Sequence, residues 1–366
     1  MILIITNTRL TGLNYHRQLV PFKNLGIPVE FRDSEFGMSD AYLTQFKCIS
    51  FLRKIESDPA RYKRLGLKIH FDIDDYWVLP SGHHLCKEYK SKRISETTIQ
   101  NIKDADFVTT TTRYLAERIR KINKNVYVLP NAIDSAEEQW QIGTEEKEFD
   151  RLRIGYIAGV HHERDVEMLY PELMKIWKDK TIQDKWQLSV GGFNFNKIDE
   201  NTIKANPYYR WVEQCFTHNY SKVKSGYAQL LATDQPLQFK QLNEPYRRIN
   251  GSFDVYQYAK QYDEIDISIA PLISSEFNRN KSQLKMIEAG MKCKPCIVSN
   301  VIPYTLEDAP VIYCNDNEWH KKIKYCVNNP EFVKDKGAEL NEYCKANYEI
   351  GVVNVERKQI LKKWLE

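Results

Sequence analysis

Short apolar runs alternate with amphipathic stretches along the first part of the chain. The apolar runs predict buried strands, and the amphipathic stretches predict helices. Strands are predicted at 2–6, 27–32, 67–73, 107–110 and 126–129. Helices are predicted within 11–25, at 95–103 and at 114–122, and the stretch 39–54 is interpreted as helical or mixed. Alternating strands and helices are typical of an α/β domain with a parallel sheet.

The same pattern restarts after a polar, acidic stretch at 135–148 that is interpreted as a linker. Strands are predicted at 152–157, 186–190, 265–270, 295–299 and 311–313, with a helix at 165–179 and further helices to the end of the chain. The stretch 194–252 has no clear period and is too long for a plain loop. We expect it to hold helices of its own and to have a role at a cleft. Two such halves predict two doubly wound, Rossmann-like domains, at 1–147 and 148–340, with an interdomain cleft.

The most informative stretch is 265–299, which predicts a strand, a polar loop, a helix and a second strand. Leu284, Ile287 and Met291 recur at helical spacing and form its apolar face. Lys281, Lys285 and Glu288 recur on another face, which we expect to be exposed. Ligands of open α/β sheets bind at the carboxyl ends of strands, where helix starts favour anions. The stretch therefore predicts a diphosphate at the two lysines and a ribose at Glu288; the alternative is a surface helix with an ordinary Lys285–Glu288 pair.

Three carboxylates, Asp72, Asp74 and Asp75, follow one another at the end of the strand predicted at 67–73. Carboxylates this close raise one another's pKa, so some partner is implied. One reading is a metal site. Another places Asp74 or Asp75 at the cleft, where it binds a sugar hydroxyl or handles a proton. A solvated turn is the third reading, and the cleft is favoured because the cluster follows the strand directly.

Two further segments follow first strands and carry candidate ligand-binding residues. Gly12 permits a tight turn, and Arg17 opens a helix aimed at the cleft; the alternative is a capped surface helix. Gly159, His161 and Arg164 follow the strand at 152–157, where Arg164 or a histidine can reach a phosphate. Adjacent histidines rarely bind one ion, so zinc is not expected at His161 and its neighbour.

Composition narrows the class of protein. The chain has 366 residues, of which 42% are hydrophobic and 28% charged, as in soluble globular proteins. A net charge of +4 fits a phosphate-bearing ligand without requiring nucleic acid. We recognise no signal peptide and no membrane span, so a cytoplasmic protein is expected. The 8 cysteines are scattered, and Cys293-Lys-Pro-Cys296 lacks the second pair of a zinc site, so we expect no metal ligand set.

These pieces resemble the retaining GT-B glycosyltransferases, family 4 in the broad sense. The resemblance rests on ADFVTTTTRYLAERI (105–119), VYVLPNAID (126–134), LRIGYIAGVHHERDVEML and APLISSEFNRNKSQLKMIEAGMKCKPCIVSNV. YHRQLVPFKNLG and HFDIDDYW recur together in a branch found in bacterial surface-sugar clusters and phage genomes. The resemblance implies a GT-B fold whose last segment, 341–366, is a helix that packs back on the first domain.

One position departs from the family pattern. The usual signature has two glutamates seven residues apart; Glu288 matches the second, and Asn280 stands where the first is expected. The branch shows a KSxLKxxE form instead, here Lys281-Ser282 through Lys285 to Glu288, which adds Ser282 to the candidate donor contacts. The missing carboxylate puts the usual contacts with the donor sugar in doubt.

The resemblance implies a glycosyltransferase with a nucleotide-diphosphate sugar as donor, UDP being favoured over GDP. We expect this enzyme to need no further cofactor and no metal, and to transfer the sugar with retention to a glycan or other hydroxyl acceptor. Asp74, Asp75, Lys285 and Glu288 are its candidate catalytic residues. One alternative is a phage-type enzyme that glycosylates hydroxylated DNA bases, allowed by basic clusters at 61–64 and 118–124. Another is an inactive protein that binds sugar nucleotides.

Overall fold

The computed structural model describes the chain except for residues 7–10, 82, 84, 144–150, 159–161, 192–245 and 250–254. The described residues fall into two compact units. Unit 1 consists of 1–135, 274–284 and 346–366, and unit 2 of 136–273 and 285–345. Most of the stretch 194–252, including the helices expected there, lies outside the described residues.

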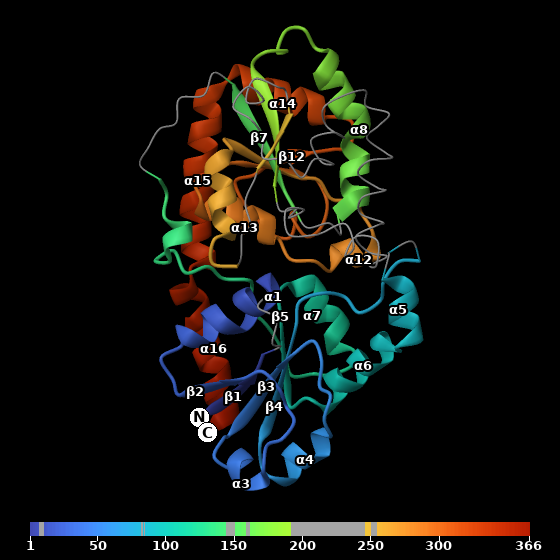
Figure 1. The fold of residues 1–366 in the computed structure, drawn as a ribbon, viewed down its shortest axis with the longest axis vertical. Coiled ribbons are helices and arrows are strands. Elements are labelled where there is room, and N and C mark those ends of the chain that lie inside the picture. The colour runs from blue at the N-terminus through green and yellow to red at the C-terminus, as the bar shows by residue number, and fades with distance from the viewer. Residues whose placement is uncertain are drawn as a thin grey trace, which may run out of the picture. The chain divides into compact units, whose positions relative to one another are not determined.

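Unit 1 is built on a parallel sheet of six described strands in the order β2-β1-β3-β4-β5-β6 (Figure 1). The strands are β1 (Ile2–Ile5), β2 (Val29–Arg32), β3 (Cys48–Leu52), β4 (Lys68–Ile73), β5 (Phe107–Thr110) and β6 (Val126–Val128). Strands β3 and β5 are buried at every position, as expected of strands covered on both faces. The chain order reverses between β1 and β3, which is where such sheets bind ligands.

Helices on either side of this sheet cover it. They are α1 (Gly12–Asn14), a π-helix (Tyr15–Leu19), α2 (Val20–Lys23), α3 (Asp40–Leu43), α4 (Pro59–Arg64), α5 (Cys86–Ser91), α6 (Ile94–Asp104), α7 (Arg113–Arg120), α12 (Glu276–Arg279) and α16 (Ile350–Leu365). Side chains of Ser39, Asp58 and Thr112 cap α3, α4 and α7. Helix α16 joins unit 1 through the Asn354 amide, which donates to the Pro21 carbonyl at 2.9 Å.

Of the two interpretations of 39–54, helical or mixed, the mixed one holds, and the helical one was wrong in the second half. Helix α3 ends at Leu43, and Cys48–Leu52 is the central strand β3. The run Cys-Ile-Ser-Phe-Leu has no alternation because both faces of β3 are buried, and a short run of this kind cannot be assigned from its period alone. The error matters because β3 positions the residue that follows it, Arg53.

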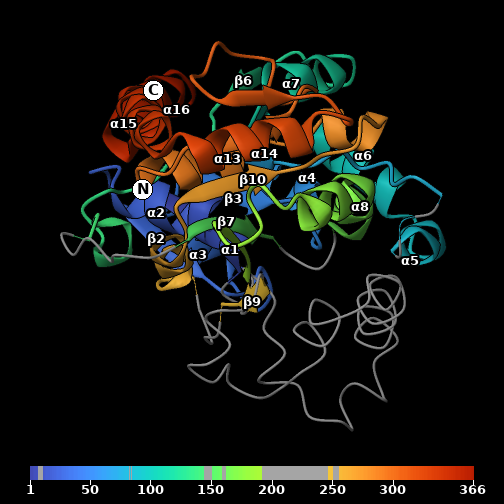
Figure 2. The ribbon, with the colours of Figure 1, turned by 90° about the horizontal axis from the view of Figure 1, so that it is seen from above.

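Unit 2 is built on a second parallel sheet of six described strands, ordered β12-β11-β10-β7-β8-β9. The strands are β7 (Leu152–Ile157), β8 (Trp186–Gly191), β9 (Tyr246–Arg248), β10 (Ile267–Ala270), β11 (Cys296–Ser299) and β12 (Ile312–Cys314). The helices are α8 (Glu163–Lys178), α13 (Leu284–Met291), α14 (Trp319–Asn328), α15 (Pro330–Tyr348, of which residues to 345 belong to unit 2) and 3-10 helices at Glu138–Trp140 and Tyr258–Glu264. Helices α8 and α14 share one apolar core on this sheet (Figure 2). The two parallel sheets confirm the prediction of two doubly wound α/β halves.

The described part of the predicted linker is not a solvated connection. Trp140 is buried, and the ammonium of Lys292 binds the carbonyls of Gln139 and Gln141 at 3.0 and 2.7 Å. The same ammonium lies 2.8 Å from the Asp263 carboxylate. Buried ammonium groups need such partners, so this stretch is fixed to unit 2.

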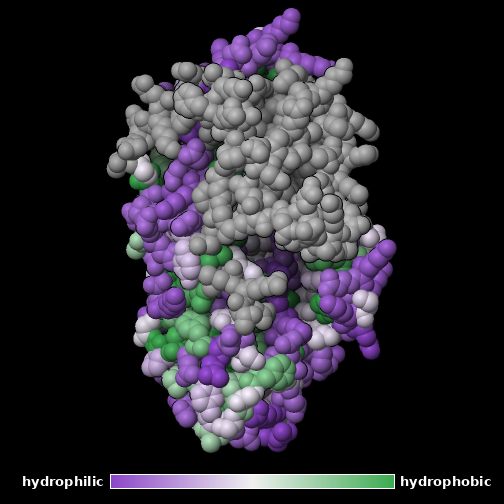
Figure 3. All heavy atoms as spheres, in the orientation of Figure 1, coloured by the Kyte–Doolittle hydropathy of each residue, from purple (hydrophilic) through white to green (hydrophobic). Residues whose placement is uncertain are grey.

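The surface of the described residues is ordinary for a folded protein. On the face drawn in Figure 3, apolar residues form separate patches among polar ones. The large apolar side chains that are exposed come from different elements, except for the neighbours Val352 and Val355 on α16; the others are Met1, Phe36, Val78, Ile142, Tyr256 and Tyr325. Such single exposed side chains need no explanation. Among the described helices, none combines the length and the apolar character that crossing a bilayer requires.

A chain of buried polar side chains crosses the sheet of unit 1. The ring of His70 on β4 lies 2.8 Å from the hydroxyls of Ser50 and Thr109, on the neighbouring strands. Burial lowers the pKa of His70 to about 4, so the ring is neutral at physiological pH. Thr109 in turn donates to Asp72. The strands are therefore joined by side chains as well as by their backbones.

Asp72 ends this chain in a buried ion pair. The Arg17 guanidinium donates to both oxygens of Asp72, at 2.8 and 2.6 Å, and to the Leu129 carbonyl at 2.6 Å. Burial alone would raise the pKa of Asp72, but Arg17 and the Thr109 hydroxyl hold it below its usual value. Removing one partner of such a pair typically costs about 3–5 kcal/mol, because the other charge is left buried.

We predict that His70→Gln flattens the acid dependence of stability. The pKa of His70 is lower in the folded protein than in the unfolded chain, so the unfolded chain binds the extra proton between pH 6.5 and pH 4. Stability is therefore lost as the pH falls through that window, by on the order of 3 kcal/mol from this residue. Urea unfolding of both proteins from pH 7 to pH 4 measures the difference, and equal slopes would contradict the buried, neutral ring.

Two helical glycines make a matched pair for a second prediction. A Cβ at Gly337 in α15 would lie 2.5 Å from the backbone oxygen of Cys293, whereas a Cβ at Gly351 in α16 meets nothing within 4 Å. Gly351→Ala should stabilise the protein by roughly 0.5–1 kcal/mol through helix propensity. Gly337→Ala should destabilise the protein despite the same gain in helix propensity, because either helix α15 or the turn at Cys293 must shift to make room for the new methyl group. Thermal unfolding measures both, and equal midpoints would show that the contact at Gly337 is loose.

Candidate functional site

The carboxyl edge of the sheet in unit 2 carries the first candidate cluster. Lys285 lies in the first turn of α13, and its ammonium stands 5.6 Å from the ring centroid of Tyr156 on β7. Asp165 in α8 accepts from the Ile273 amide at 2.9 Å and lies 2.8 Å from Nδ1 of His162. Burial alone would raise the pKa of Asp165, but the bond from His162, the Ile273 amide and the charge of Lys285 lower it. A cation and a fixed carboxylate thus share this strand edge.

Glu288 corrects the prediction of an exposed polar face. Its side chain is buried, with 4% of the residue exposed, and one carboxylate oxygen accepts from the Tyr262 hydroxyl at 2.9 Å. Tyr262 belongs to the 3-10 helix Tyr258–Glu264, and burial together with Glu288 raises its pKa well above 10. The residues of α13 from Met286 to Met291 are all buried. The 3-10 helix therefore covers Glu288, whereas Lys285 of the same expected face stays partly exposed.

Lys281 and Ser282 do not lie on the same helix as Lys285. Helix α13 begins only at Leu284, after α12 and a turn, so the predicted spacing of three charges along one helix face was wrong. Both residues belong to unit 1, where Ser282 accepts from the Asn131 amide at 2.9 Å. The Lys281 ammonium lies 5.1 Å from the ring centroid of Phe277.

Asn280, where the family pattern expects a carboxylate, is fully buried. Its amide nitrogen donates to the Glu276 carbonyl at 2.7 Å, and its Oδ1 has no hydrogen-bond partner within the described part of the chain. An amide that already donates to a carbonyl cannot be flipped, so the orphan atom is an acceptor. The position therefore lacks the charge of a glutamate but keeps an acceptor oxygen.

The other predicted ligand contacts divide into three groups. Gly12 does not form the expected tight turn; it begins α1 after the cap Thr11, and a side chain there would meet no heavy atom within 4 Å. Arg17 is buried against Asp72, so its guanidinium serves the interior of unit 1 and the expected aim toward a ligand was wrong. Arg164 lies in the first turn of α8, while Gly159 and His161 fall outside the described residues.

Asp74 and Asp75 share one guanidinium. Arg53 donates to both oxygens of Asp74, at 2.6 and 2.8 Å, and to one oxygen of Asp75 at 2.6 Å. The side chains are 17% and 35% exposed, so solvent reaches both carboxylates. Burial and the charge of Asp75 raise the pKa of Asp74, and Arg53 opposes them. The partner implied by three neighbouring carboxylates is thus two arginines, Arg17 for Asp72 and Arg53 for the other two.

Arg53 has an unusual backbone. Its φ is 61°, and the Lys54 amide donates to the Leu52 carbonyl at 2.8 Å, so the three residues form a γ-turn with positive φ at its centre. The Arg53 amide donates to the Asp72 carbonyl at 2.9 Å. A conformation of this kind costs on the order of 1–3 kcal/mol and persists where surrounding contacts impose it. The sequence interpretation missed Arg53 because it placed 39–54 in a helical or mixed region.

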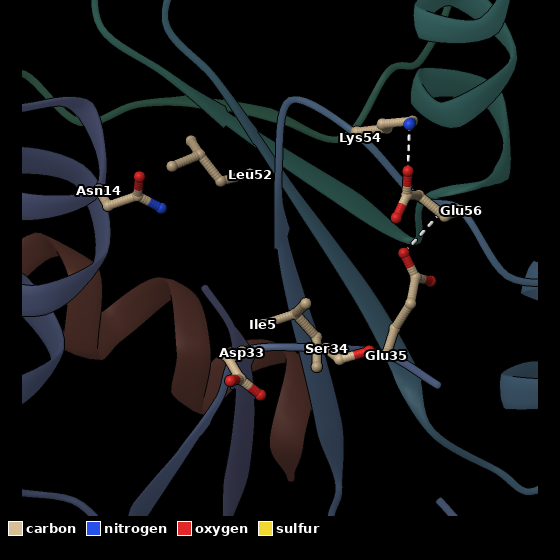
Figure 4. A pocket seen from close by; sticks show the side chains of 8 residues that line it. All are labelled: Ile5, Asn14, Asp33, Ser34, Glu35, Leu52, Lys54 and Glu56. Atoms are coloured by element: carbon tan, nitrogen blue, oxygen red, sulfur yellow. Dashed lines mark hydrogen bonds and ion pairs between the residues drawn. The ribbon is translucent and has the colours of Figure 1, made fainter. Parts of the chain in front are cut away.

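A small, solvent-open pocket with a cavity volume of about 60 Å³ lies beside this turn (Figure 4). It is lined by Ile5, Asn14, Asp33, Ser34, Glu35, Leu52, Lys54 and Glu56, which follow or end β1, β2 and β3. Lys54 pairs with Glu56, whose amide donates to Glu35 at 2.6 Å. Leu52 and Lys54 flank Arg53, so the γ-turn forms part of the pocket wall.

Three of the seven basic residues in the two clusters, Arg61, Arg64 and Arg118, pair with carboxylates within unit 1. Arg61 pairs with Asp40 at 2.6 Å, and Arg118 pairs with Glu276 at the same distance. Arg64 lies 3.8 Å from Asp58. Paired arginines of this kind are solvated helix faces more often than a phosphate-binding surface.

The cysteines support no metal or redox site in the described residues. Seven cysteines there carry free thiols, and no cluster of three or more potential metal ligands occurs among those residues. Cys293 lies in the turn after α13, and Cys296 opens the buried strand β11. Burial raises the pKa of Cys296 to about 12, so its thiol is protonated and unreactive.

No protein-family model and no curated protein sequence matches this chain. Solved structures do. The Anabaena protein HepE, solved in complex with UDP and glucose, aligns over 99% of both chains with a TM-score of 0.60 and 10% identity. Sucrose-phosphate synthase from Thermosynechococcus elongatus aligns over 99% of this chain and 98% of its own, with a TM-score of 0.63 and 12% identity.

A UDP-forming trehalose-phosphate synthase from Burkholderia xenovorans aligns over 89% of this chain and 78% of its own, with a TM-score of 0.60 and 10% identity. At this level of identity the likeness concerns the fold. Because two of these likenesses cover nearly the whole chain, both units are included in them. The chain therefore has the two-domain, Rossmann-like architecture of the GT-B glycosyltransferases.

Proposed function

We propose that the protein is a glycosyltransferase that moves a sugar from a UDP-sugar to an acceptor hydroxyl. The observation that carries this proposal is Lys285, which places an ammonium in the first turn of α13 at the carboxyl edge of the second sheet. The fold supports it, because HepE has been solved with UDP-glucose. Donor binding at a strand edge beside a helix start is expected of doubly wound sheets.

In this proposal the donor diphosphate binds at Lys285 and the start of α13. Negative charge grows on the diphosphate as the glycosidic bond breaks, and a fixed ammonium stabilises that charge more in the transition state than in the ground state. Arg164, Gly159 and His161 are proposed as further phosphate contacts, as are Lys281 and Ser282. Glu288, fixed by Tyr262, is proposed to hold the ribose.

The proposed reaction has no covalent enzyme intermediate and no metal. The sugar passes from the leaving diphosphate to the acceptor oxygen on the same face, which retains the anomeric configuration, and the transition state resembles an oxocarbenium ion. Asp74 or Asp75 accepts the proton of the acceptor hydroxyl. A positioned base of this kind contributes about 10²–10⁴-fold in rate.

The pocket of unit 1 is the proposed acceptor site. Its lining carries three carboxylates, Asp33, Glu35 and Glu56, against one ammonium, Lys54. An excess of negative charge disfavours phosphodiester acceptors and favours uncharged hydroxyl compounds such as glycans. This favours a glycan acceptor over the modified-DNA alternative, which the paired arginines of the basic clusters do not support.

Lys285→Ala should weaken UDP binding while the fold survives. Loss of a charge-assisted bond to a phosphate costs roughly 1.5–3 kcal/mol, about 10- to 150-fold in Kd. Lys321→Ala removes the same charge from an exposed position on α14 and should bind UDP normally. Calorimetric titration with UDP measures all three proteins. Equal affinities would leave Lys285 as an ordinary surface residue and remove the main support for the donor site.

Glu288 is better tested as Glu288→Gln than as Glu288→Ala, because alanine would leave the Tyr262 hydroxyl without its hydrogen-bond acceptor.

Asp74→Asn and Asp75→Asn should leave UDP affinity nearly unchanged, because the proposed nucleotide contacts lie elsewhere. At least one of them should lower turnover by about 10²-fold or more, since an amide cannot accept the proton. Steady-state rates of UDP release and UDP titrations measure the two effects separately. Normal turnover in both variants would make the carboxylates structural. Loss of UDP binding in both would make them donor or metal ligands and contradict the metal-free mechanism.

A further inference from the structure

Arg53 occupies a strained turn at the end of a central strand. Strand β3 ends at Leu52, and the chain then passes through a residue with φ of 61°. Arginine in this region is disfavoured, and glycine is the residue that adopts it without cost. The conformation is fixed by two backbone bonds, from Arg53 to the Asp72 carbonyl and from Lys54 to the Leu52 carbonyl. A strained non-glycine residue at a strand end is a reason to look for function.

What the turn achieves is the direction of the Arg53 side chain. Three hydrogen bonds from one guanidinium reach Asp74 and Asp75, which end the neighbouring strand β4. A planar guanidinium binds a carboxylate in two places at once and so fixes its orientation. Without it, two carboxylates adjacent in sequence would repel each other at a half-buried site.

The charges around Asp74 leave Arg53 as its main partner. The groups that act on Asp74 are Arg53, Asp75 and, from the π-helix, Arg17. Arg17 is engaged by Asp72 and buried. Tyr89 on α5 lies within the influence of the same groups, and burial raises the pKa of its hydroxyl, so it stays neutral. Removing Arg53 therefore leaves Asp74 beside a second carboxylate, while Arg17 stays engaged by Asp72.

We propose that Arg53 is a positioning residue that holds Asp74 and Asp75 oriented and charged to receive the proton of the acceptor hydroxyl. This inference rests on the proposed function. In the step it serves, the bond between the sugar carbon and the diphosphate oxygen breaks and its electron pair leaves with UDP. The acceptor oxygen forms the new bond to that carbon, and its proton passes to the carboxylate.

The pocket of unit 1 adjoins the turn, and Asp74 and Asp75 are not among the residues that line it. Leu52 and Lys54, the neighbours of Arg53, both line the pocket of unit 1. The γ-turn thus connects the pocket wall to the carboxylate pair within one unit. A positioning role and a purely structural role for Arg53 predict different results for the pH dependence of turnover.

The experiment compares Arg53→Gly, Arg53→Lys and the control Arg93→Gly. Glycine at 53 relieves the backbone strain while removing the guanidinium, so the variant should fold. Arg93 also has a positive φ of 50°. Its side chain is 77% exposed, and its ion pair with Glu96 is long at 4.0 Å. Rates are measured from pH 4.5 to pH 8.5 with a UDP-sugar that the wild type consumes, and the carboxyl carbons of the aspartates are titrated by NMR in the same proteins.

Arg53→Gly should lower kcat by at least about tenfold and move the acid limb of its pH profile upward by about one unit or more, with UDP affinity unchanged. The aspartate titration should move in the same direction. Arg53→Lys should restore part of the acid limb, because it keeps the charge but not the two-point contact. Arg93→Gly should behave as wild type.

If the aspartate titration of Arg53→Gly moves while its pH–rate profile stays as in the wild type, the inference is overturned, and Arg53 has a structural role alone. A loss of kcat with no displacement of the acid limb would overturn it as well. A wild type that consumes none of the common UDP-sugars would refute the proposed function itself, and a positioning residue would then have no reaction to serve. The failures of the inference and of the proposed function are therefore distinguishable.

Discussion

A buried carboxylate constrains the whole of unit 1. Asp72 lies at the end of a central strand with only 3% of its surface exposed, and an ionised group there must have a cation and donors around it. Arg17 from the π-helix and Thr109 from β5 supply them. Arg17 also binds the carbonyl of Leu129, so one guanidinium connects β4, the first helical segment and the end of β6.

The consequences of this pair reach the candidate carboxylates. The Asp72 carbonyl accepts a hydrogen bond from the Arg53 amide and so helps to fix the γ-turn, while the Asp72 carboxylate forms the ion pair with Arg17. The other two carboxylates of the cluster are then left to Arg53. A π-helix where Arg17 arises is itself a rare conformation that often occurs near functional sites. The interior ion pair and the half-buried pair of carboxylates thus form one arrangement with two arginines.

The sequence predicts the fold better than the site. Alternation of apolar runs and amphipathic helices identified ten of the twelve described strands. Strand β3 was missed because a strand buried on both faces carries no period, and β9 was missed because it lies in the stretch 194–252, where no period was found. The site residues were harder because helix faces depend on where a helix begins and on what covers it. Helix α13 begins three residues after Lys281, and the 3-10 helix that covers Glu288 comes from residues 258–264, far away in sequence. Arg53 could have been found from the apolar run Cys-Ile-Ser-Phe-Leu, which ends directly before it, had that run been assigned as a strand.

The most direct test of the central claim is the consumption of UDP-sugars by the full chain. UDP release is measured by a coupled assay with four donors: UDP-glucose, UDP-galactose, UDP-N-acetylglucosamine and UDP-N-acetylgalactosamine. Each donor is tested with and without a panel of uncharged glycosides as acceptors. The account predicts that at least one donor releases UDP, that an uncharged glycoside accelerates the release, and that the transferred sugar is found on a hydroxyl with its anomeric configuration retained. No release from any donor, together with no binding of UDP, would contradict it.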